Sequence, residues 1–269
     1  MATPPASYRN ALSNYLRKHA FVPRYGTEQA LSLVTDDGVR LSGARLHGPA
    51  DAPGTVVLVH GFSQSSRVPR IHAFAHLLAT RMHVIVPDLR GHGASGGLSS
   101  MGPKEPLDVK AAVEAADPSL PVVTVGISLG GAAVLLHGGT FGGVAGVVPI
   151  SAPAWWGAWD TPATRRIQRY AMTQAGRRFL AVFMRTRIAQ VCEGVPHAEE
   201  QAAAIAPAFT LVVADPGDHY FAEEHPQTIY RWANQPKDLW LLPGTGHGTD
   251  LLTPDFGHRL VGELDRRLR

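Results

Sequence analysis

The sequence predicts an α/β fold built on an eight-stranded, mostly parallel sheet with helices on both faces and a small helical cap. Short runs of consecutive apolar residues recur along the chain, and the segments between them are long enough to hold a helix. Such runs are typical of strands buried on both faces, and strands that alternate with helices form parallel sheets through right-handed crossovers. Two near-alternating strands precede this rhythm, and one stretch without strand signals interrupts it.

The N-terminal part of the chain predicts a helical arm followed by an antiparallel hairpin. Residues 1–27 contain apolar side chains spaced as on one face of an amphipathic helix. Those side chains are Tyr8, Leu12, Tyr15 and Leu16. Residues 30–34 and 39–46 then show near-alternating apolar positions around a turn that contains Gly38. This pattern is typical of paired antiparallel strands, and we expect both to be edge strands of the sheet.

Six further strands and a closing helix complete the predicted core. The strands are expected at residues 55–59, 83–86, 122–125, 145–150, 209–214 and 239–242. The chain then ends in a stretch with helical spacing, residues 256–268. Residues 28–151 and 207–269 therefore form the expected core domain.

Between these two parts, residues 152–206 lose the strand signal and take on helical spacing instead. The apolar residues at helical intervals are Ile167, Tyr170, Phe179, Leu180, Phe183, Met184 and Ile188. We expect this stretch to be a helical insertion that forms a cap over the strand ends.

The composition excludes several classes of protein. Of the 269 residues, 45% are hydrophobic and 17% are charged, against about 25% charged in an average domain, so the chain can bury a large core and is not intrinsically disordered. The 28 glycines and 21 prolines exclude a coiled coil or a long helical array. A formal net charge of +3 is too small for the basic stripe of a nucleic-acid-binding protein, so we expect no nucleic-acid partner.

The single cysteine and the distribution of apolar segments indicate the compartment. Cys192 has no partner for an intramolecular disulfide. Residues 1–15 lack the continuous apolar stretch of a signal peptide, and no apolar run approaches the roughly 18 residues of a membrane helix. We therefore expect a cytoplasmic protein without an integral membrane segment, and the sequence leaves its oligomeric state open.

A glycine-rich segment in the middle of the chain carries the first chemical signature. A predicted strand runs into Gly126-Ile127-Ser128-Leu129-Gly130 and then into a helical stretch, which is the G-x-S-x-G pattern in the context that it requires. A serine on such a sharp turn has a strained backbone, and glycines two residues away on either side avoid a collision. The turn would lift the serine hydroxyl above the sheet and direct a helix N-terminus at any negative charge formed there. The alternative is a glycine-rich turn with an incidental serine.

Four segments in a fixed order resemble the α/β-hydrolase superfamily, and more narrowly its serine-hydrolase branch of monoacylglycerol lipases, related esterases and serine aminopeptidase-like proteins. They are His60-Gly61-Phe62, residues 87–96 (Pro-Asp-Leu-Arg-Gly-His-Gly-Ala-Ser-Gly), the turn at Ser128, and Gly244-Thr245-Gly246-His247. The resemblance covers residues 57–247. It implies the α/β-hydrolase fold, whose serine hydrolases are expected to work without a metal ion or an organic cofactor.

The resemblance also supplies partners for a nucleophilic serine, which needs a base and an orienting carboxylate. His247 stands where the family has the base. Asp215 and Asp218 both follow the strand at 209–214, and related hydrolases have strand-Gly-x-x-Asp there. That offset favours Asp218 as the acid, while Asp215 replaces the usual glycine and remains the alternative, with capping of its own turn as its expected role.

The first two segments are expected to shape the loops around the serine. A loop that leaves the strand next to the Ser128 turn can direct the Phe62 N–H at the same point as the Leu129 N–H, giving two donors for an oxyanion. The alternative is an ordinary turn in which Gly61 only supplies backbone freedom. We expect Asp88 and His92 to bond to backbone groups, because a metal site there lacks further ligands at useful spacing.

Two groups of residues in the predicted cap have two interpretations each. Trp155, Trp156 and Trp159 follow a strand end near the serine, where they either wall an acyl pocket or fasten the cap to the core. Seven arginines lie in a stretch without Asp or Glu, and they form either a solvated helix face or a site for an anionic group. They are Arg165, Arg166, Arg169, Arg177, Arg178, Arg185 and Arg187.

The residues together predict a serine hydrolase that cleaves a carboxylic ester of a small molecule through an acyl-enzyme. A thioesterase, a small-substrate peptidase, a C–C bond hydrolase or an acyltransferase would use the same groups, because fold and triad do not determine the leaving group. A non-catalytic binding protein on the same fold is the remaining alternative.

Overall fold

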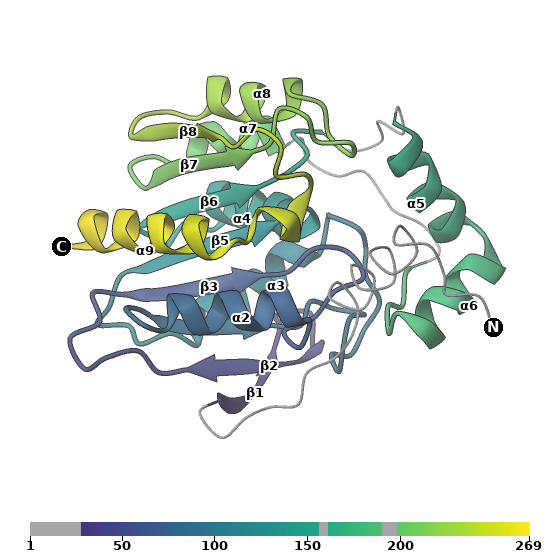
Figure 1. Ribbon diagram of the computed structural model, residues 1–269. Helices are drawn as coiled ribbons and strands as arrows, with labels where there is room; N and C mark the ends of the chain where they lie inside the picture. Colours follow the sequence, from purple (N-terminus) through teal and green to yellow (C-terminus); the bar gives the residue numbers. More distant parts are fainter. Residues whose placement is uncertain (1–27, 156–160, 190–197) are drawn as a thin grey trace, which may run out of the picture.

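A computed structural model describes residues 28–155, 161–189 and 198–269, so the predicted helical arm at 1–27 lies outside the described residues. One sheet runs through the molecule in the order β1-β2-β4-β3-β5-β6-β7-β8 (Figure 1). Its strands are β1 (Glu28–Val34), β2 (Arg40–Leu46), β3 (Thr55–Val59), β4 (His83–Pro87), β5 (Val122–Ile127), β6 (Gly146–Ile150), β7 (Phe209–Ala214) and β8 (Lys237–Leu241). All neighbours from β4 to β8 pair in parallel, which confirms the predicted eight-stranded, mostly parallel sheet.

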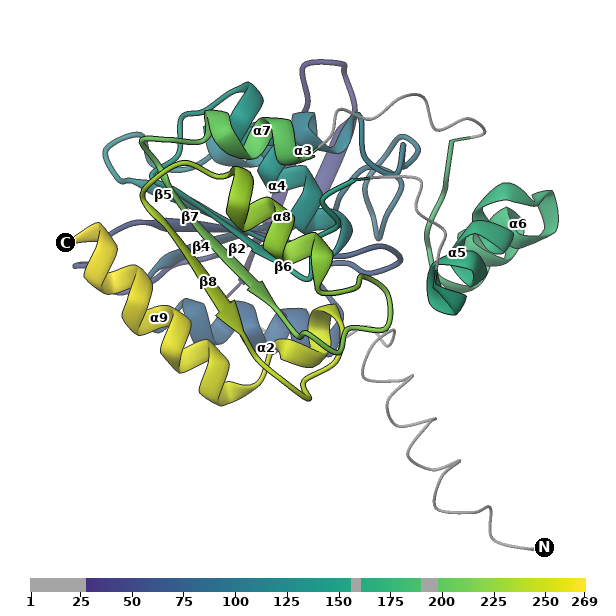
Figure 2. The same cartoon turned by 90° about the horizontal axis from the view of Figure 1, so that it is seen from above.

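Helices cover both faces of this sheet, as Figure 2 shows in a view from above. One face carries α2 (Pro69–Leu78) and α9 (Pro254–Leu268), and the other carries α3 (Glu105–Glu114), α4 (Leu129–Thr140), α7 (Ala198–Ala204) and α8 (Glu224–Trp232). Beside the carboxyl ends of the parallel strands lie α5 (Pro162–Met172) and α6 (Gln174–Phe183) (Figure 1). No helix within the described ranges combines the length and the apolarity needed to cross a bilayer.

The continuous apolar runs follow from burial on both faces. In β3, Val56 and Leu58 belong to the buried cluster under α2 and α9, whereas Val57 and Val59 belong to the cluster under α3 and α4. Successive side chains of a strand point to opposite faces, so a strand covered on both sides needs apolar residues at every position.

The predicted hairpin is present, but only one of its strands lies at the edge of the sheet. β1 pairs with β2 alone, whereas β2 also pairs antiparallel with β4 through Gly43 and Pro87. A side chain at Gly43 would collide with the backbone of Val86, so glycine is needed for this approach. The expectation of two edge strands is therefore wrong for β2, and β8 is the opposite edge.

The helical spacing predicted through Ile188 ends earlier than expected. α6 stops at Phe183, Arg185 has a positive φ of 47°, and the chain continues extended. This segment docks on the glycine-rich loop after β4, because the Arg187 N–H donates to the Gly91 carbonyl over 2.8 Å. A side chain at Gly91 would collide with the Arg187 carbonyl, so the loop glycine permits the contact.

Candidate active site

Ser128 occupies the sharp turn between β5 and α4. Its backbone has φ 53° and ψ −113°, a conformation that residues other than glycine rarely adopt. The Ser128 N–H donates to the Ile150 carbonyl over 2.8 Å. A side chain at Gly126 would collide with the Gly130 backbone, and one at Gly130 would lie 2.5 Å from the Val59 carbonyl oxygen. The close packing of these backbones maintains the strained turn.

His247 and Asp218 continue from Ser128 in a line of hydrogen bonds. His247 Nε2 lies 3.0 Å from the Ser128 hydroxyl oxygen, and His247 Nδ1 lies 2.6 Å from Oδ2 of Asp218. With the imidazole proton on Nδ1, facing the carboxylate, Nε2 accepts from the serine hydroxyl. The three side chains come from the ends of β5, β7 and β8, so the parallel sheet brings together groups far apart in the sequence.

Two backbone amides hold the Asp218 carboxylate in its orientation. Oδ1 accepts from the N–H groups of Tyr220, over 2.7 Å, and Phe221, over 3.3 Å. This arrangement leaves Oδ2 directed at His247. The rings of Tyr220 and Phe221 in turn pack against the imidazole, with centroid distances of 4.3 and 5.5 Å.

Asp215 bonds to backbone amides instead of to the imidazole. Its Oδ1 accepts from the Gly217 N–H over 2.8 Å, and its Oδ2 accepts from the Gly246 N–H over 2.6 Å. Burial raises the pKa of Asp215, but hydrogen bonds from the amides of Gly246, Gly217 and other loop residues outweigh it and hold that pKa below its ordinary value. The ionised Asp215 thus connects its own turn to the loop that carries His247.

The expected oxyanion donors are the N–H groups of Phe62, in the loop after β3, and of Leu129, directly after Ser128. Leu129 is the first residue of α4, where a helix leaves its N–H without an intrahelical acceptor. Within the part of the chain that the structure describes, neither the Phe62 N–H nor the Leu129 N–H has an acceptor. The neighbouring Gly61 N–H is bonded to Gln64 Oε1 over 3.1 Å, which orders the loop.

His60 and His92 are buried behind the oxyanion loop with their ring centroids 5.2 Å apart. His60 Nε2 accepts from the Leu89 N–H over 3.0 Å, and His92 Nδ1 lies 3.0 Å from the Arg90 carbonyl oxygen. Both therefore bond to backbone, as expected for His92. Burial lowers the pKa of each to about 4, and the charge of His60 further lowers the pKa of His92.

We expect this pair to make the folded state sensitive to acid. A histidine with a pKa of 6.5 unfolded and about 4 folded contributes its full stability above pH 6.5 and loses it as the pH falls towards 4. Urea unfolding between pH 7.5 and pH 4.5 should show a smaller decline for His92→Gln than for the wild type. Parallel declines would contradict the assignment.

A mostly apolar cavity of about 430 Å³ opens onto Ser128 and His247. Its near wall comes from the oxyanion loop, the serine turn and the histidine loop, and its far wall from α5, α6 and the residues that follow. The lining residues are Gly61, Phe62, Ser63, Gln64, Ile127, Ser128, Ala163, Arg166, Ile167, Tyr170, Phe179, Leu180, Met184, Tyr220, His247, Gly248 and Thr249. Among these described lining residues, Arg166 is the only basic side chain apart from His247, and none is acidic.

The cap tryptophans do not enter this cavity where the structure describes them. Trp155 stacks on His225, with ring centroids 4.1 Å apart, and packs against the buried cluster around α4 and α8. This position favours the interpretation that Trp155 fastens the segment to the core. Trp156 and Trp159 lie outside the described residues.

The cap arginines also separate into different places. Arg166 lines the serine cavity, while Arg177, Arg178 and Arg187 line a hollow of about 490 Å³ on another side of α6. Arg185 faces a third pocket. The five arginines that line these pockets therefore do not form one continuous site for an anionic group.

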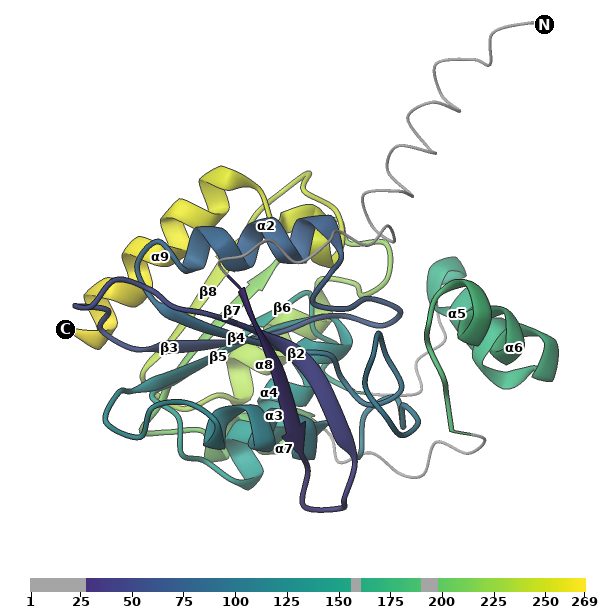
Figure 3. The same ribbon diagram turned by 90° about the horizontal axis from the view of Figure 1, so that it is seen from below.

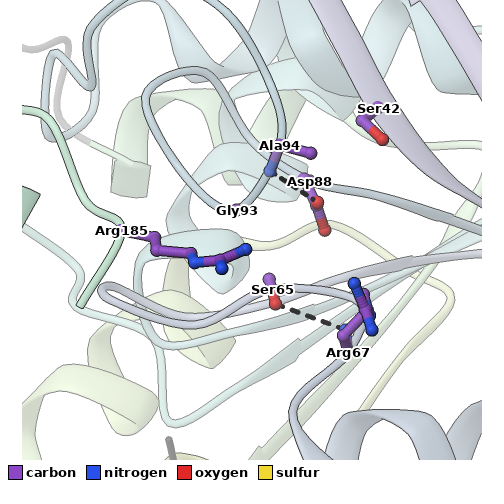
Figure 4. A pocket seen from close by; sticks show the side chains of 7 residues that line it. All are labelled: Ser42, Ser65, Arg67, Asp88, Gly93, Ala94 and Arg185. Atoms are coloured by element: carbon purple, nitrogen blue, oxygen red, sulfur yellow. Dashed lines mark hydrogen bonds between the residues drawn. The ribbon is translucent and has the colours of Figure 1, made fainter. Parts of the chain in front are cut away.

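That third pocket, of about 360 Å³, is polar (Figure 4). The described side chains that line it include two serines but no histidine that would activate a hydroxyl. The Asp88 carboxylate in it accepts from the Ala94 N–H, and Ser65 Oγ accepts from the Arg67 N–H. Asp88 therefore bonds to backbone as expected. The serine cavity is the better candidate for an active site, because it alone of these pockets joins a hydroxyl to an imidazole.

Several residues of the site escaped the sequence reasoning. Gln64 links the oxyanion loop to the histidine loop, since its Nε2 donates to Thr249 Oγ1 over 3.4 Å. Ser151 Oγ accepts from the Gly248 N–H over 3.1 Å and thereby holds the loop after His247. The Tyr220 ring packs on His247, and burial raises the pKa of its hydroxyl. No local pattern marks these residues, because each acts through a partner that only folding brings near.

Comparison with known proteins identifies the family and related folds. A family model described as the alpha/beta hydrolase family matches residues 56–262. The structure is similar to an esterase from Pyrococcus furiosus, with a TM-score of 0.71, 20% identity, and coverage of 91% of this chain and 97% of that one. It is also similar to an esterase from Rhodococcus sp., with a TM-score of 0.69, 20% identity, and coverage of 89% and 98%. No curated protein matches the sequence.

Proposed function

Because this chain belongs to the α/β-hydrolase family, we propose that it hydrolyses carboxylic esters of small molecules through an acyl-enzyme intermediate. The observation that carries the proposal is the line of hydrogen bonds from Ser128 through His247 to Asp218, with contacts of 3.0 and 2.6 Å, at the floor of an apolar cavity. A strained nucleophilic turn, a base and an orienting carboxylate are the parts that acyl transfer requires.

In this mechanism the Ser128 oxygen attacks the ester carbonyl carbon while His247 Nε2 takes the hydroxyl proton. The carboxylate of Asp218 stabilises the imidazolium, and the Phe62 and Leu129 N–H groups stabilise the oxyanion of the tetrahedral intermediate. His247 then donates the proton to the leaving alcohol as the C–O bond breaks, which yields the acyl-enzyme. A water molecule repeats the sequence, and the acid is released with Ser128 restored.

The cavity walls support an apolar acyl group as the recognised part of the substrate. Ile167, Leu180 and Met184 face the same small cluster that joins α5 and α6 to the core, and they line the cavity beside Ser128. Burial of methylene groups against such walls supplies binding energy without a charged partner. The preferred substrates are therefore neutral esters with medium-length acyl chains.

Turnover of a panel of acetyl, butyryl, octanoyl and dodecanoyl esters, with the matching thioesters and amides, tests this proposal. The expected result is highest kcat/KM for a medium-length oxygen ester. Higher kcat/KM for the thioesters would replace the esterase by the thioesterase alternative, and absence of turnover across the panel would favour a binding protein.

Two substitutions distinguish an acyl wall from a fastening residue. Leu180→Trp fills the cavity, so we expect kcat/KM to fall for octanoyl esters much more than for acetyl esters, since each methylene contributes roughly 1 to 3 kcal/mol of discrimination. Trp155→Ala should lower the melting temperature and leave that ratio unchanged. A changed ratio in Trp155→Ala would return this residue to the acyl site.

A further inference from the structure

A second cluster of chemically active side chains lies at the start of β1, away from the serine cavity. Glu28 is the first residue of β1, and His72 and His76 stand one helical turn apart on α2. Figure 3 shows this end of β1 beside α2. Glu28 pairs with Leu46, and Leu46 pairs with Val84 near the amino end of β4, whereas Ser128 follows the carboxyl end of β5. The cluster therefore lies towards the amino ends of the parallel strands, whereas Ser128 lies at their carboxyl ends.

The three side chains converge on one point. Nε2 of His76 lies 2.8 Å from Oε1 of Glu28, and Nε2 of His72 contacts the same oxygen. One donor atom from each residue lies within 4.8 Å of the other two, and no other group of three such residues does so among those described. The two imidazole rings lie 4.6 Å apart between centroids.

Burial requires a compensating charge or several donors for the Glu28 carboxylate. The Glu28 side chain is 3% exposed and that of His72 is 16% exposed. A buried carboxylate is stable only when it is paired with charge or held by several donors, and a neutral imidazole offers at most one N–H to it. His76, with 36% of its side chain exposed, leaves the cluster open to solvent on one side.

We propose that Glu28, His72 and His76 bind a divalent transition-metal ion of the zinc type. Two histidines at i and i+4 on one helix face present their nitrogens to one ion, and a carboxylate completes a common zinc donor set. Around zinc, with bonds of about 2.0 to 2.2 Å, ligand atoms lie roughly 3.4 Å apart, so side-chain movements of less than about an ångström convert the observed cluster into a chelate. Water completes the coordination on the exposed side.

The bound ion would fasten the edge of the sheet. Among the described strands, β1 has a neighbour on one side only, and the ion would tie its first residue to α2. Because a ligand that binds only the folded state stabilises it by mass action, the ion raises the melting temperature without taking part in the chemistry at Ser128.

The test uses the full chain, freed of metal with EDTA and dialysed, with ZnCl₂ as the probe. We expect calorimetry to show one zinc ion bound per chain and the melting temperature to rise with zinc concentration. Glu28→Gln and His76→Ala should each weaken zinc binding by at least about tenfold, since even changes outside the ligand set cost that much in metal sites. The matched control is His258→Ala, which removes an exposed histidine from α9 and should bind zinc as the wild type does.

Direct binding keeps the proposal falsifiable if a ligand variant is less stable for packing reasons. Zinc affinity that is equal in the wild type and in Glu28→Gln would overturn the site, as would binding that is lost in His258→Ala. Absence of zinc binding to the wild type would also overturn it. Ester hydrolysis by Ser128 does not depend on any of these outcomes.

Discussion

Ser128→Ala is expected to lower kcat/KM for esters by at least about 10³-fold while the protein remains folded, because triad residues act as a unit. The substitution removes the hydroxyl oxygen that bonds to His247 Nε2 and would form the acyl-enzyme. Alanine meets the same strain as serine at φ 53°, so the melting temperature should change little. Steady-state kinetics and thermal unfolding of the purified variant measure the two effects.

Covalent labelling gives this prediction an independent readout. A fluorophosphonate probe should modify the wild type once, and mass spectrometry should place the adduct on the peptide that contains Ser128. The matched control is Ser63→Ala, because Ser63 also lines the cavity and also has a positive φ, 56°, yet should not form the adduct. Labelling that survives Ser128→Ala, or disappears in Ser63→Ala, would refute Ser128 as the nucleophile.

Asp218→Asn is expected to reduce kcat by about 10³ to 10⁴, the scale seen when an amide replaces a triad carboxylate. An asparagine that keeps the two backbone bonds at Oδ1 would turn its NH₂ group towards His247. That group cannot accept from Nδ1–H, so the imidazole adopts the tautomer with its proton on Nε2 and can no longer take one from Ser128.

Asp215→Asn is the matched control, since it makes the same chemical change three residues earlier. Asp215 accepts from backbone amides, including those of Gly217 and Gly246, and does not bond to His247, so the variant should lose stability and less than about tenfold in kcat. Kinetics on a short-chain ester and thermal unfolding of both variants separate the effects. If Asp215→Asn costs more activity than Asp218→Asn, the acid has been misassigned.

Much of this molecule is determined by local sequence. The buried strands are recognisable because a sheet covered on both faces demands apolar residues at every position, as in β3 and β7. The serine turn is recognisable because steric collisions at Gly126 and Gly130 leave few acceptable residues. Both patterns depend on residues only a few positions apart, so they can be recognised from the sequence alone.

The tertiary structure decided what depends on partners far apart in the chain. The sequence favoured Asp218 over Asp215 only through a family offset, whereas the fold separates them by the atoms they meet, His247 for one and the Gly246 amide for the other. β2 lies inside the sheet because β4 pairs with it, a fact that no property of its own seven residues reveals.

Contacts between distant parts of the chain also explain the residues whose place the sequence left open or did not indicate. Trp155 was expected either to wall the acyl site or to fasten the cap to the core, and its stacking on His225 favours the second role. Glu28 is far from His72 and His76 in the sequence, and the packing of β1 on α2 alone turns them into one cluster. Short-range sterics and burial are encoded locally, whereas the convergence of side chains from separate elements exists only after the sheet has formed.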